Sequence, residues 1–270
     1  MTPPTDHQHQ ANPIRSADDF AAAFHVSRET LDRLAIYEHL LRHWQKTINL
    51  VAPSTLDAIW HRHFADSAQL LVLAPTATTW LDLGSGAGFP GLVIAVLLAE
   101  RVTAGVPSPL AGEGQGGGDC RTSEGGFLPT LNPSPPGGGG SLPRITLIDS
   151  NARKCAFLRE VVRQTGIAPS VTVDILSTRI EVAATQARLG QPDVISARAL
   201  APLDRLVGLA AKLSSPRTVG LFLKGRDAEA ELKAAEKMWN FNAELVPSRT
   251  DPDARVIVIR NLQPKSKAKE

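Results

Sequence analysis

The stretch that decides the fold is Trp80-Leu-Asp-Leu-Gly-Ser-Gly-Ala-Gly-Phe-Pro-Gly91, in which three alternating glycines follow a short apolar run. A second apolar run, residues 92–99, follows at once. This order predicts a strand, a tight turn and a helix. Glycine adopts backbone angles closed to other residues and lets a ligand approach the main chain, and amides at a helix start can bind it. We therefore expect a nucleotide-binding turn at Gly84, Gly86 and Gly88.

From residue 79 onward, short apolar runs alternate with helical patterns, which predicts parallel strands with helical crossovers. The runs predicted as strands are residues 80–83, 145–148, 171–173, 194–196 and 219–223. Two further runs, residues 243–246 and 255–259, are separated only by a polar turn, so an antiparallel hairpin is expected. The expected fold class is α/β: a doubly wound, mostly parallel seven-stranded sheet with a C-terminal antiparallel hairpin.

The first 75 residues have an all-helical pattern instead. A capping box that starts at Ser16 and a second cap at Ser27 predict the first two helices. After the helix-breaking Pro53, either Ser54 or Thr55 is predicted to cap a third helix. The expected division of the chain is a disordered tail (1–15), a small helical N-terminal region (16–75), an α/β domain (76–262) and a basic tail (263–270).

One segment, residues 103–143, does not fit the alternation. It holds 12 of the 21 glycines and 7 of the 20 prolines of the chain and has no apolar periodicity. A structureless loop of this length is unusual inside a compact domain. We expect a disordered Gly/Pro-rich insertion. A lid or an RNA-binding arm is the alternative, and the few basic and aromatic residues of the segment count against the arm.

A second nucleotide signal is Asp149, which ends the next predicted strand. A carboxylate there can accept both ribose hydroxyls of an adenosine. Gly84 and Asp149 are 65 residues apart, and removing the 41 residues of the insertion leaves 24, close to the roughly 20 expected in nucleotide-binding folds. The glycine spacing differs from the dinucleotide fingerprint, and the Gly-Lys-Ser/Thr of a phosphate-binding loop is missing. NAD is therefore disfavoured as the ligand.

Composition limits the class of protein. The chain is 43% hydrophobic and 21% charged with a net charge of +2, so any nucleic-acid contact must come from local clustering of cations. Its two cysteines give no disulfide framework, which suits a reducing compartment. The longest apolar run, residues 91–99, is far shorter than the roughly 18 residues that span a bilayer. We expect a cytoplasmic protein without membrane association.

The glycine turn, the ribose acid and the terminal hairpin together resemble class I methyltransferases that use S-adenosylmethionine. Shorter motifs resemble the RsmG/GidB family, which methylates N7 of a guanosine in bacterial 16S rRNA. These motifs are Asn49-Leu50, Arg62-His63 with Asp66-Ser67, Leu147-Ile-Asp-Ser150, Phe157-Leu-Arg159, Arg179-Ile-Glu181, Ile195-Ser-Ala-Arg-Ala199 and Leu223-Lys-Gly225. The resemblance covers about residues 30 to 260. It departs from the family in the insertion and in Ala197, which separates Ser196 from Arg198.

The resemblance implies S-adenosylmethionine as cofactor, and 16S rRNA or the small ribosomal subunit as partner of a monomer. The cofactor-binding residues it implies are Gly84, Gly86, Gly88, Phe89, Asp149, Ile180, Glu181 and Arg198. RNA contacts are expected from Asn49, Arg62, His63, Arg179 and Lys224, and further cations from Arg42, His43 and Lys46. Other roles stay open for these residues. Phe89 and Ile180 could instead pack in the core, Arg198 could pair with a carboxylate, and the charges expected to bind RNA could lie on a solvated surface. The aromatic residues Tyr37, Trp44 and Trp60 either stack on bases or pack in the core.

No catalytic side chain is identified, and the chemistry does not require one. Guanine N7 already presents a lone pair, so transfer can proceed by alignment of the reacting atoms. The motif of exocyclic-amine methylation is absent, and methylation at carbon 5 needs a cysteine nucleophile. No metal is expected, because His39-Leu-Leu-Arg-His43 lacks the Glu of the zinc-protease motif. The alternatives are a methyltransferase for another RNA, a protein or a small molecule, an NAD-dependent oxidoreductase, and a non-catalytic RNA-binding protein.

Overall fold

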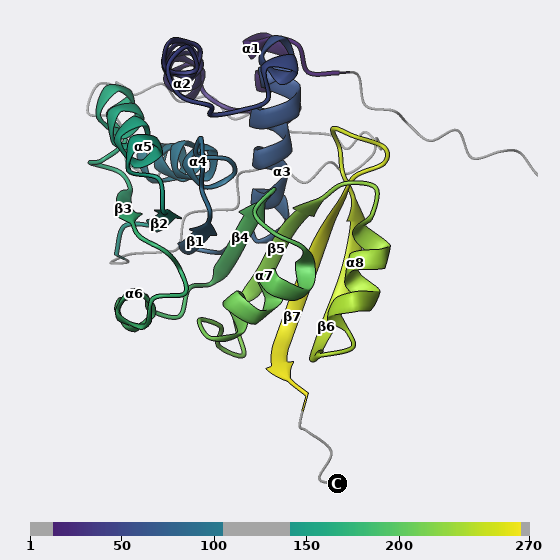
Figure 1. The fold of residues 1–270 in the computed structure, drawn as a ribbon. Coiled ribbons are helices and arrows are strands. Elements are labelled where there is room, and N and C mark those ends of the chain that lie inside the picture. Colours follow the sequence, from purple (N-terminus) through teal and green to yellow (C-terminus); the bar gives the residue numbers. More distant parts are fainter. Residues whose placement is uncertain (1–12, 105–140, 266–270) are drawn as a thin grey trace, which may run out of the picture.

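The computed structural model describes residues 13–104 and 141–265, which build a seven-stranded sheet with helices on both faces (Figure 1). The strands are β1 (Thr79–Leu83), β2 (Arg144–Asp149), β3 (Thr172–Ser177), β4 (Val194–Arg198), β5 (Val219–Lys224), β6 (Trp239–Pro247) and β7 (Arg255–Pro264). Their spatial order is β3-β2-β1-β4-β5-β7-β6. Strands β1 to β5 are parallel, and β7 is antiparallel to both β5 and β6. The predicted fold class is confirmed.

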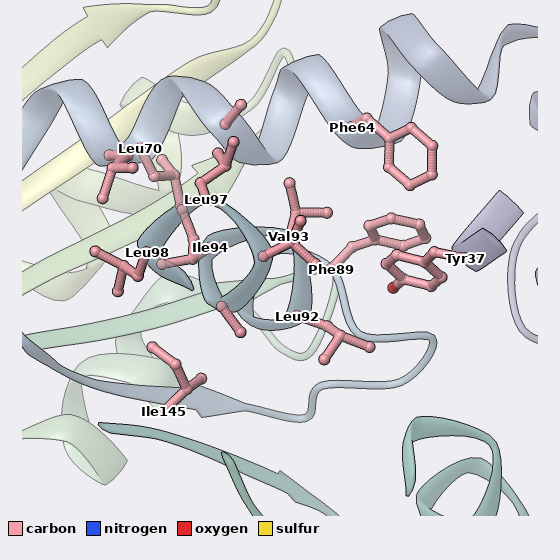
Figure 2. Close-up of a cluster of buried hydrophobic side chains, with 14 of the residues drawn as sticks. Tyr37, Phe64, Leu70, Phe89, Leu92, Val93, Ile94, Leu97, Leu98 and Ile145 are labelled. Atoms are coloured by element: carbon pink, nitrogen blue, oxygen red, sulfur yellow. The ribbon is translucent and has the colours of Figure 1, made fainter. Parts of the chain in front are cut away.

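The helices pack on the two faces of the sheet, where they contact apolar side chains of its strands. They are α1 (Ala17–Phe24), α2 (Arg28–Trp44), the 3₁₀ helix η1 (Pro53–Ala58), the π-helix η2 (Trp60–Ala65), α3 (Asp66–Leu73), α4 (Gly91–Ala104), α5 (Ala152–Thr165), α6 (Ala183–Arg188), α7 (Leu203–Ala211) and α8 (Ala228–Ala235). The larger core cluster joins α1 to α5 with one sheet face, and the smaller one joins α7 and α8 with the other. Figure 2 shows the larger cluster around α4. In β1, Trp80 belongs to the larger cluster, and Leu81 and Leu83 to the smaller.

The first two helices begin where the sequence places their caps. The Oγ of Ser16 accepts a hydrogen bond from the Asp19 amide at 3.1 Å, and the Asp19 carboxylate accepts one from the Ser16 amide, also at 3.1 Å. Ser27 caps α2 by accepting from the Thr30 amide at 3.2 Å. Each serine satisfies an amide that the first helical turn leaves without an intrahelical partner.

The predicted cap of the third helix is wrong. Helix η1 begins at Pro53 with Ala52 as its N-cap, and no side chain caps it. Proline suits the first helical position because its fixed φ is already helical and it has no amide hydrogen to satisfy. The Thr55 hydroxyl instead donates back to the Ala52 carbonyl at 2.7 Å.

Several predicted bounds also differ. Strand β3 extends to Ser177, beyond the predicted 171–173. The helical patterns of residues 180–189 and 228–239 form shorter helices: α6 is confined to Ala183–Arg188, and α8 ends at Ala235, because Trp239 begins β6 and packs into the smaller cluster as a strand residue. Residues 1–12, 105–140 and 266–270 lie outside the described residues, so the disordered tail and the insertion stay predictions. Helix α4 and strand β7 extend into the stretches predicted as insertion and basic tail. Across residues 13–104 and 141–265, none of the helices combines the length and the apolar character needed to span a membrane.

Candidate active site

The glycine turn joins β1 to α4 at the C-terminal edge of the parallel strands. Gly84, Gly86 and Gly88 have φ angles of 65°, 55° and 94°, a region that glycine enters without the penalty a Cβ brings. Ser85 ties the turn to β2, since its amide donates to the Ile148 carbonyl at 2.9 Å and its Oγ accepts from the Ile148 amide at 3.1 Å. The turn is therefore held in shape by the neighbouring strand.

Asp149 ends β2 and contacts the glycine turn directly. Its Oδ2 accepts a hydrogen bond from the Gly86 amide at 2.9 Å, and its Oδ1 accepts from the Asn151 amide at 2.7 Å. The structure thus brings together the two nucleotide signals read from the sequence. An ionised carboxylate has about four lone-pair sites, so Asp149 keeps acceptor capacity for a ligand.

A buried carboxylate, Asp82, supports the turn from within the sheet. Its Oδ1 accepts from the Ser196 hydroxyl at 2.8 Å, and its Oδ2 accepts from the Gly91 amide at 3.3 Å. Burial raises the pKa of Asp82 to about 6. Glycine at position 91 allows this close approach, because a Cβ there would lie 2.8 Å from the Asp82 Cβ. Asp82 therefore fixes the start of α4 relative to β1 and β4.

Phe89 links the glycine turn to the N-terminal helices. Phe89 is 3% exposed. Its ring stacks on that of Tyr37, with 5.3 Å between ring centres and 14° between ring planes, and on that of His63, with 4.8 Å and 20°. Figure 2 shows the Tyr37 and Phe89 rings face to face. The guanidinium carbon of Arg198 lies 4.9 Å from the Phe89 ring centre. The core packing kept open for Phe89 is what the structure shows, and through it the turn touches Arg198.

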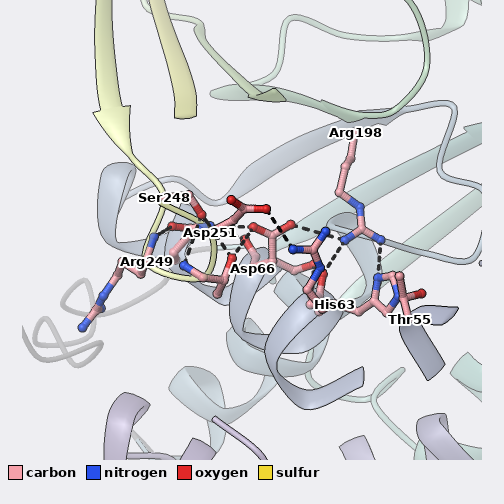
Figure 3. A network of polar contacts seen from close by, with 11 residues as sticks. Thr55, His63, Asp66, Arg198, Ser248, Arg249 and Asp251 are labelled. Atoms are coloured by element: carbon pink, nitrogen blue, oxygen red, sulfur yellow. Dashed lines mark hydrogen bonds and ion pairs between the residues drawn. The ribbon is translucent and has the colours of Figure 1, made fainter. Parts of the chain in front are cut away.

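Arg198 lies at the end of β4 in a polar cluster with His63 and Asp66 (Figure 3). One guanidinium nitrogen is 3.3 Å from Asp66 Oδ2, and the other donates to His63 Nδ1 at 2.8 Å. Because arginine has no acceptor, His63 Nδ1 must accept and Nε2 carries the proton, which it donates to Thr55 Oγ1 at 2.7 Å. Burial, with Arg198 and Arg62 nearby, lowers the pKa of His63 to about 3. His63 is therefore neutral at physiological pH.

The turn between β6 and β7 is fastened to α3 in the same cluster. The second oxygen of Asp66, Oδ1, accepts from the Thr250 hydroxyl at 2.9 Å, and Gln69 Oε1 accepts from the Arg249 amide at 2.9 Å. Burial raises the pKa of Asp66. At the surface, Arg62 pairs with Asp251 of the same turn at 2.8 Å. These contacts join the N-terminal and C-terminal parts of the described chain.

A pocket of about 370 Å³ opens beside this cluster, at the C-terminal ends of β4 and β5. Its lining residues are Thr55, Arg62, His63, Asp66, Arg198, Ala199, Leu223, Lys224, Gly225, Glu231, Ser248, Thr250, Asp251, Ala254 and Arg255. Three of its cations already face carboxylates of the pocket: Arg62 faces Asp251, Arg198 faces Asp66, and Lys224 pairs with Glu231 at 2.7 Å. The pocket offers both donors and acceptors to a ligand.

The remaining predicted site residues lie in different places. Of the predicted RNA-binding set, Arg62, His63 and Lys224 line the pocket, whereas Asn49 and Arg179 are exposed outside it. Ile180 is buried in the smaller core cluster, and the exposed Glu181 pairs with Arg205 at 3.2 Å. His43 and Lys46 are exposed, whereas Arg42 is bound to Glu38 and to the Leu56 carbonyl.

The aromatic residues considered for base stacking are core residues. Tyr37 and Trp60 are buried, and Trp44 packs on Phe157 with 5.8 Å between ring centres. Among the residues placed by the structure, no three His, Cys, Asp or Glu side chains are grouped so that they could hold a metal ion.

A family model covers both the glycine turn and the residues that line the pocket. The family model GidB, described as rRNA small subunit methyltransferase G, matches residues 30–104 and 141–255. The chain belongs to the GidB family. It is 46% identical to the ribosomal RNA small subunit methyltransferase G of Parvibaculum lavamentivorans, over 92% of this chain and 91% of that one. The corresponding protein of Rhodospirillum centenum is 43% identical over 94% of each chain. A solved methyltransferase from Geobacter sulfurreducens aligns with a TM-score of 0.49 and 12% identity, over 92% of this chain and 98% of that one.

Sequence reasoning missed the acidic half of this GidB-family pocket. Asp66 was noted only as part of a motif, and Asp251 and Glu231 were not singled out, although all three line the pocket. The spacing of Arg62 and Asp66 on one helical face was the available signal for Asp66. Asp251 lies in a turn that reaches the pocket only through the fold, so no local pattern marks it.

Proposed function

We propose that this GidB-family chain transfers a methyl group from S-adenosylmethionine to N7 of a guanosine in 16S rRNA. The observation that carries the proposal is the adjacency of two sites. The glycine turn with Asp149 lies at the C-terminal edge of β1 and β2, and the charged pocket lies at the same edge of β4 and β5. Phe89 of the turn stacks on His63 of the pocket, so the two sites share a wall. Open α/β sheets bind their ligands at this edge.

The glycine turn and Asp149 fit the methyl donor. The positive φ angles of Gly84, Gly86 and Gly88 turn the chain sharply, and the partly exposed Gly86, where a Cβ would meet no side chain, leaves room for a ligand at the main chain. Asp149 retains acceptor sites that suit the two ribose hydroxyls. In this proposal Ile180 and Glu181 lie around the adenine, and the donor supplies an electrophilic methyl group on sulfur.

The charged pocket fits guanine. The base presents donors at N1 and N2 and an acceptor at O6, and the pocket offers carboxylates and cations side by side. In the transfer, the N7 lone pair forms the new C–N bond while the S–CH₃ bond breaks and sulfur keeps the electron pair. Sulfur thereby loses its positive charge and the purine ring gains it, so the transfer creates no new net charge.

No proton needs to leave N7, so the transfer requires neither a general base nor a nucleophilic side chain. His63 is neutral and both its nitrogens are engaged, so it is not available as a general base. Cys155 is buried and burial raises the pKa of its thiol, which makes it a poor nucleophile. Catalysis then rests on holding N7, methyl carbon and sulfur in line.

In this proposal RNA phosphates meet two exposed cations, Arg62 in the pocket and Arg179 outside it, with Asn49 as a further contact. The protein acts as a monomer in the cytoplasm, where small subunits are assembled. Light scattering tests the monomer, and the salt dependence of RNA binding counts the phosphate contacts.

Mapping N7-methylguanosine in 16S rRNA tests the proposal. Cells that lack the gene should lose one such modification, and the intact gene should restore it while a gene encoding Asp149→Ala should not. Unchanged N7 methylation in the deletion strain would overturn the proposal. If the purified protein binds S-adenosylmethionine but methylates another RNA, a protein or a small molecule, that substrate replaces the ribosomal one.

A further inference from the structure

The loop that follows β4 lies between the glycine turn and the pocket. Ala199 lines the pocket and has φ 53°, a left-handed conformation uncommon for a residue with a Cβ. The next side chain, Leu200, lies against the glycine turn, since a Cβ built on Gly84 would be 2.4 Å from Leu200 Cδ1. Leu200 is 39% exposed, although it is a large apolar residue. It is therefore placed where both sites meet.

Two ionic side chains fasten this loop at successive points. The Lys224 ammonium, at the end of β5, donates to the Ala201 carbonyl at 2.6 Å and pairs with Glu231 Oε2 at 2.7 Å. The same Glu231 oxygen accepts from the Leu203 amide at 2.7 Å, at the start of α7, where a helix favours negative charge. The loop is thus tied to β5 and to α8.

The Lys224 side chain is only 9% exposed, and its contacts leave it little freedom to follow an RNA phosphate. An ammonium has three donors, and two of them are used by Ala201 and Glu231. The sequence resemblance assigned Lys224 to RNA contact. Its actual partners instead favour a role in fixing the position of the loop.

We propose that Lys224 and Glu231 are positioning residues, which hold Leu200 against Gly84 as the wall between the methyl-donor site and the pocket. The proposal rests on the proposed S-adenosylmethionine site at the glycine turn, but on no particular nucleotide as target. An apolar wall at this place keeps water from the transfer path and fixes how far the donor reaches toward the pocket.

The test compares Lys224→Met, which keeps an unbranched apolar stem and removes the ammonium, with Leu200→Ala and with the double variant. S-adenosylmethionine binding is measured by calorimetry without RNA. Each single variant should bind roughly tenfold more weakly, and the double variant no more weakly than the worse single one, because both changes release the same wall. Lys233→Met, at an exposed lysine of α8, is the matched control and should bind as the parent does.

RNA binding separates the two roles of Lys224. A positioning lysine leaves the slope of log affinity against log salt unchanged in Lys224→Met, whereas loss of a phosphate contact reduces that slope by about one. Parental S-adenosylmethionine affinity with a reduced salt slope would overturn the proposal. If Lys224→Met does not fold, Glu231→Gln keeps an acceptor for Leu203 and breaks the ion pair. It should bind S-adenosylmethionine roughly tenfold more weakly, and parental affinity of this variant would overturn the proposal. If 16S rRNA proves not to be the substrate, the calorimetric result still decides the role of Lys224.

Discussion

The phenolic hydroxyl of Tyr37, on α2, donates a hydrogen bond to the backbone carbonyl of Ala87 in the glycine turn. Both residues are buried, so the N-terminal helices hold the turn from behind. Tyr37→Phe removes the hydroxyl and keeps the ring that stacks on Phe89. We expect the free energy of unfolding to fall by about 1 to 3 kcal/mol, the cost of a buried carbonyl without a donor.

The same variant should bind S-adenosylmethionine more weakly, because the turn loses one of its anchors. Urea denaturation gives the stability and calorimetry gives the affinity. If Tyr37→Phe is destabilised but binds the donor as the parent does, the turn does not depend on this contact.

Asp149→Ala should bind S-adenosylmethionine at least tenfold more weakly. The substitution removes the acceptor proposed for the ribose and also the partner of the Gly86 amide. Loss of a hydrogen bond to a charged group is worth about 1.5 to 3 kcal/mol, which corresponds to roughly tenfold or more in affinity. Asp174→Ala, which removes an exposed carboxylate from β3, is the control and should leave affinity unchanged. Equal affinities of Asp149→Ala and the parent would refute the site.

Asp66→Ala should destabilise the fold by about 3 kcal/mol, because it leaves the mostly buried guanidinium of Arg198 without its carboxylate. It also frees the Thr250 hydroxyl and so loosens the β6–β7 turn. Glu181→Ala breaks an exposed ion pair with Arg205 and should cost only about 0 to 1 kcal/mol. Chemical denaturation of both variants measures the contrast, and equal losses would mean that the Asp66 contacts do not hold the turn.

Acid should destabilise the protein through His63. Its pKa is about 3 in the folded protein and 6.5 in the unfolded chain, so below pH 6.5 the unfolded state binds a proton that the folded state does not. Stability therefore decreases as pH falls from 6.5 toward 3, with a slope of at most about 1.4 kcal/mol per pH unit. His63→Gln keeps an acceptor for Arg198 and a donor for Thr55 but does not titrate.

The comparison of His63→Gln with the parent isolates this effect. The raised pKa of Asp82 acts in the opposite direction between pH 3.8 and about 6, but it is present in both proteins and cancels in the difference. The stability advantage of the parent should shrink as pH falls from 6.5. Stability is measured by chemical denaturation at several pH values. A stability difference between the two proteins that does not change with pH would contradict the assignment.

The sheet and the glycine turn could be predicted because their signals are local. The apolar run of β1, the alternating glycines and the capping serines Ser16 and Ser27 each act within a few residues, and the structure has them as expected. Asp149 could be paired with the turn because strand ends meet at one edge of a parallel sheet. The parts of the fold that depend on interactions between residues close in sequence can thus be predicted from the sequence.

The pocket could not be predicted in the same way. The contact between Asp66 and Thr250 joins residues 184 positions apart, and no local pattern indicates that the two meet. Strand β6 was predicted too short because, at the sheet edge, it carries exposed polar side chains instead of an apolar run. The roles of Lys224 and Glu231 depend on where β5 and α8 lie relative to one loop. These contacts depend on where the residues lie in the folded protein, so residue type alone does not predict them.

The fastening of the β6–β7 turn to α3 has a consequence for the order in which the enzyme is completed. Chains are synthesised from the N-terminus, so the glycine turn, Asp149 and Arg198 all emerge before Thr250 and its neighbours exist. The side of the site proposed for the methyl donor can therefore assemble first, and the side proposed for RNA is finished only when the hairpin reaches α3.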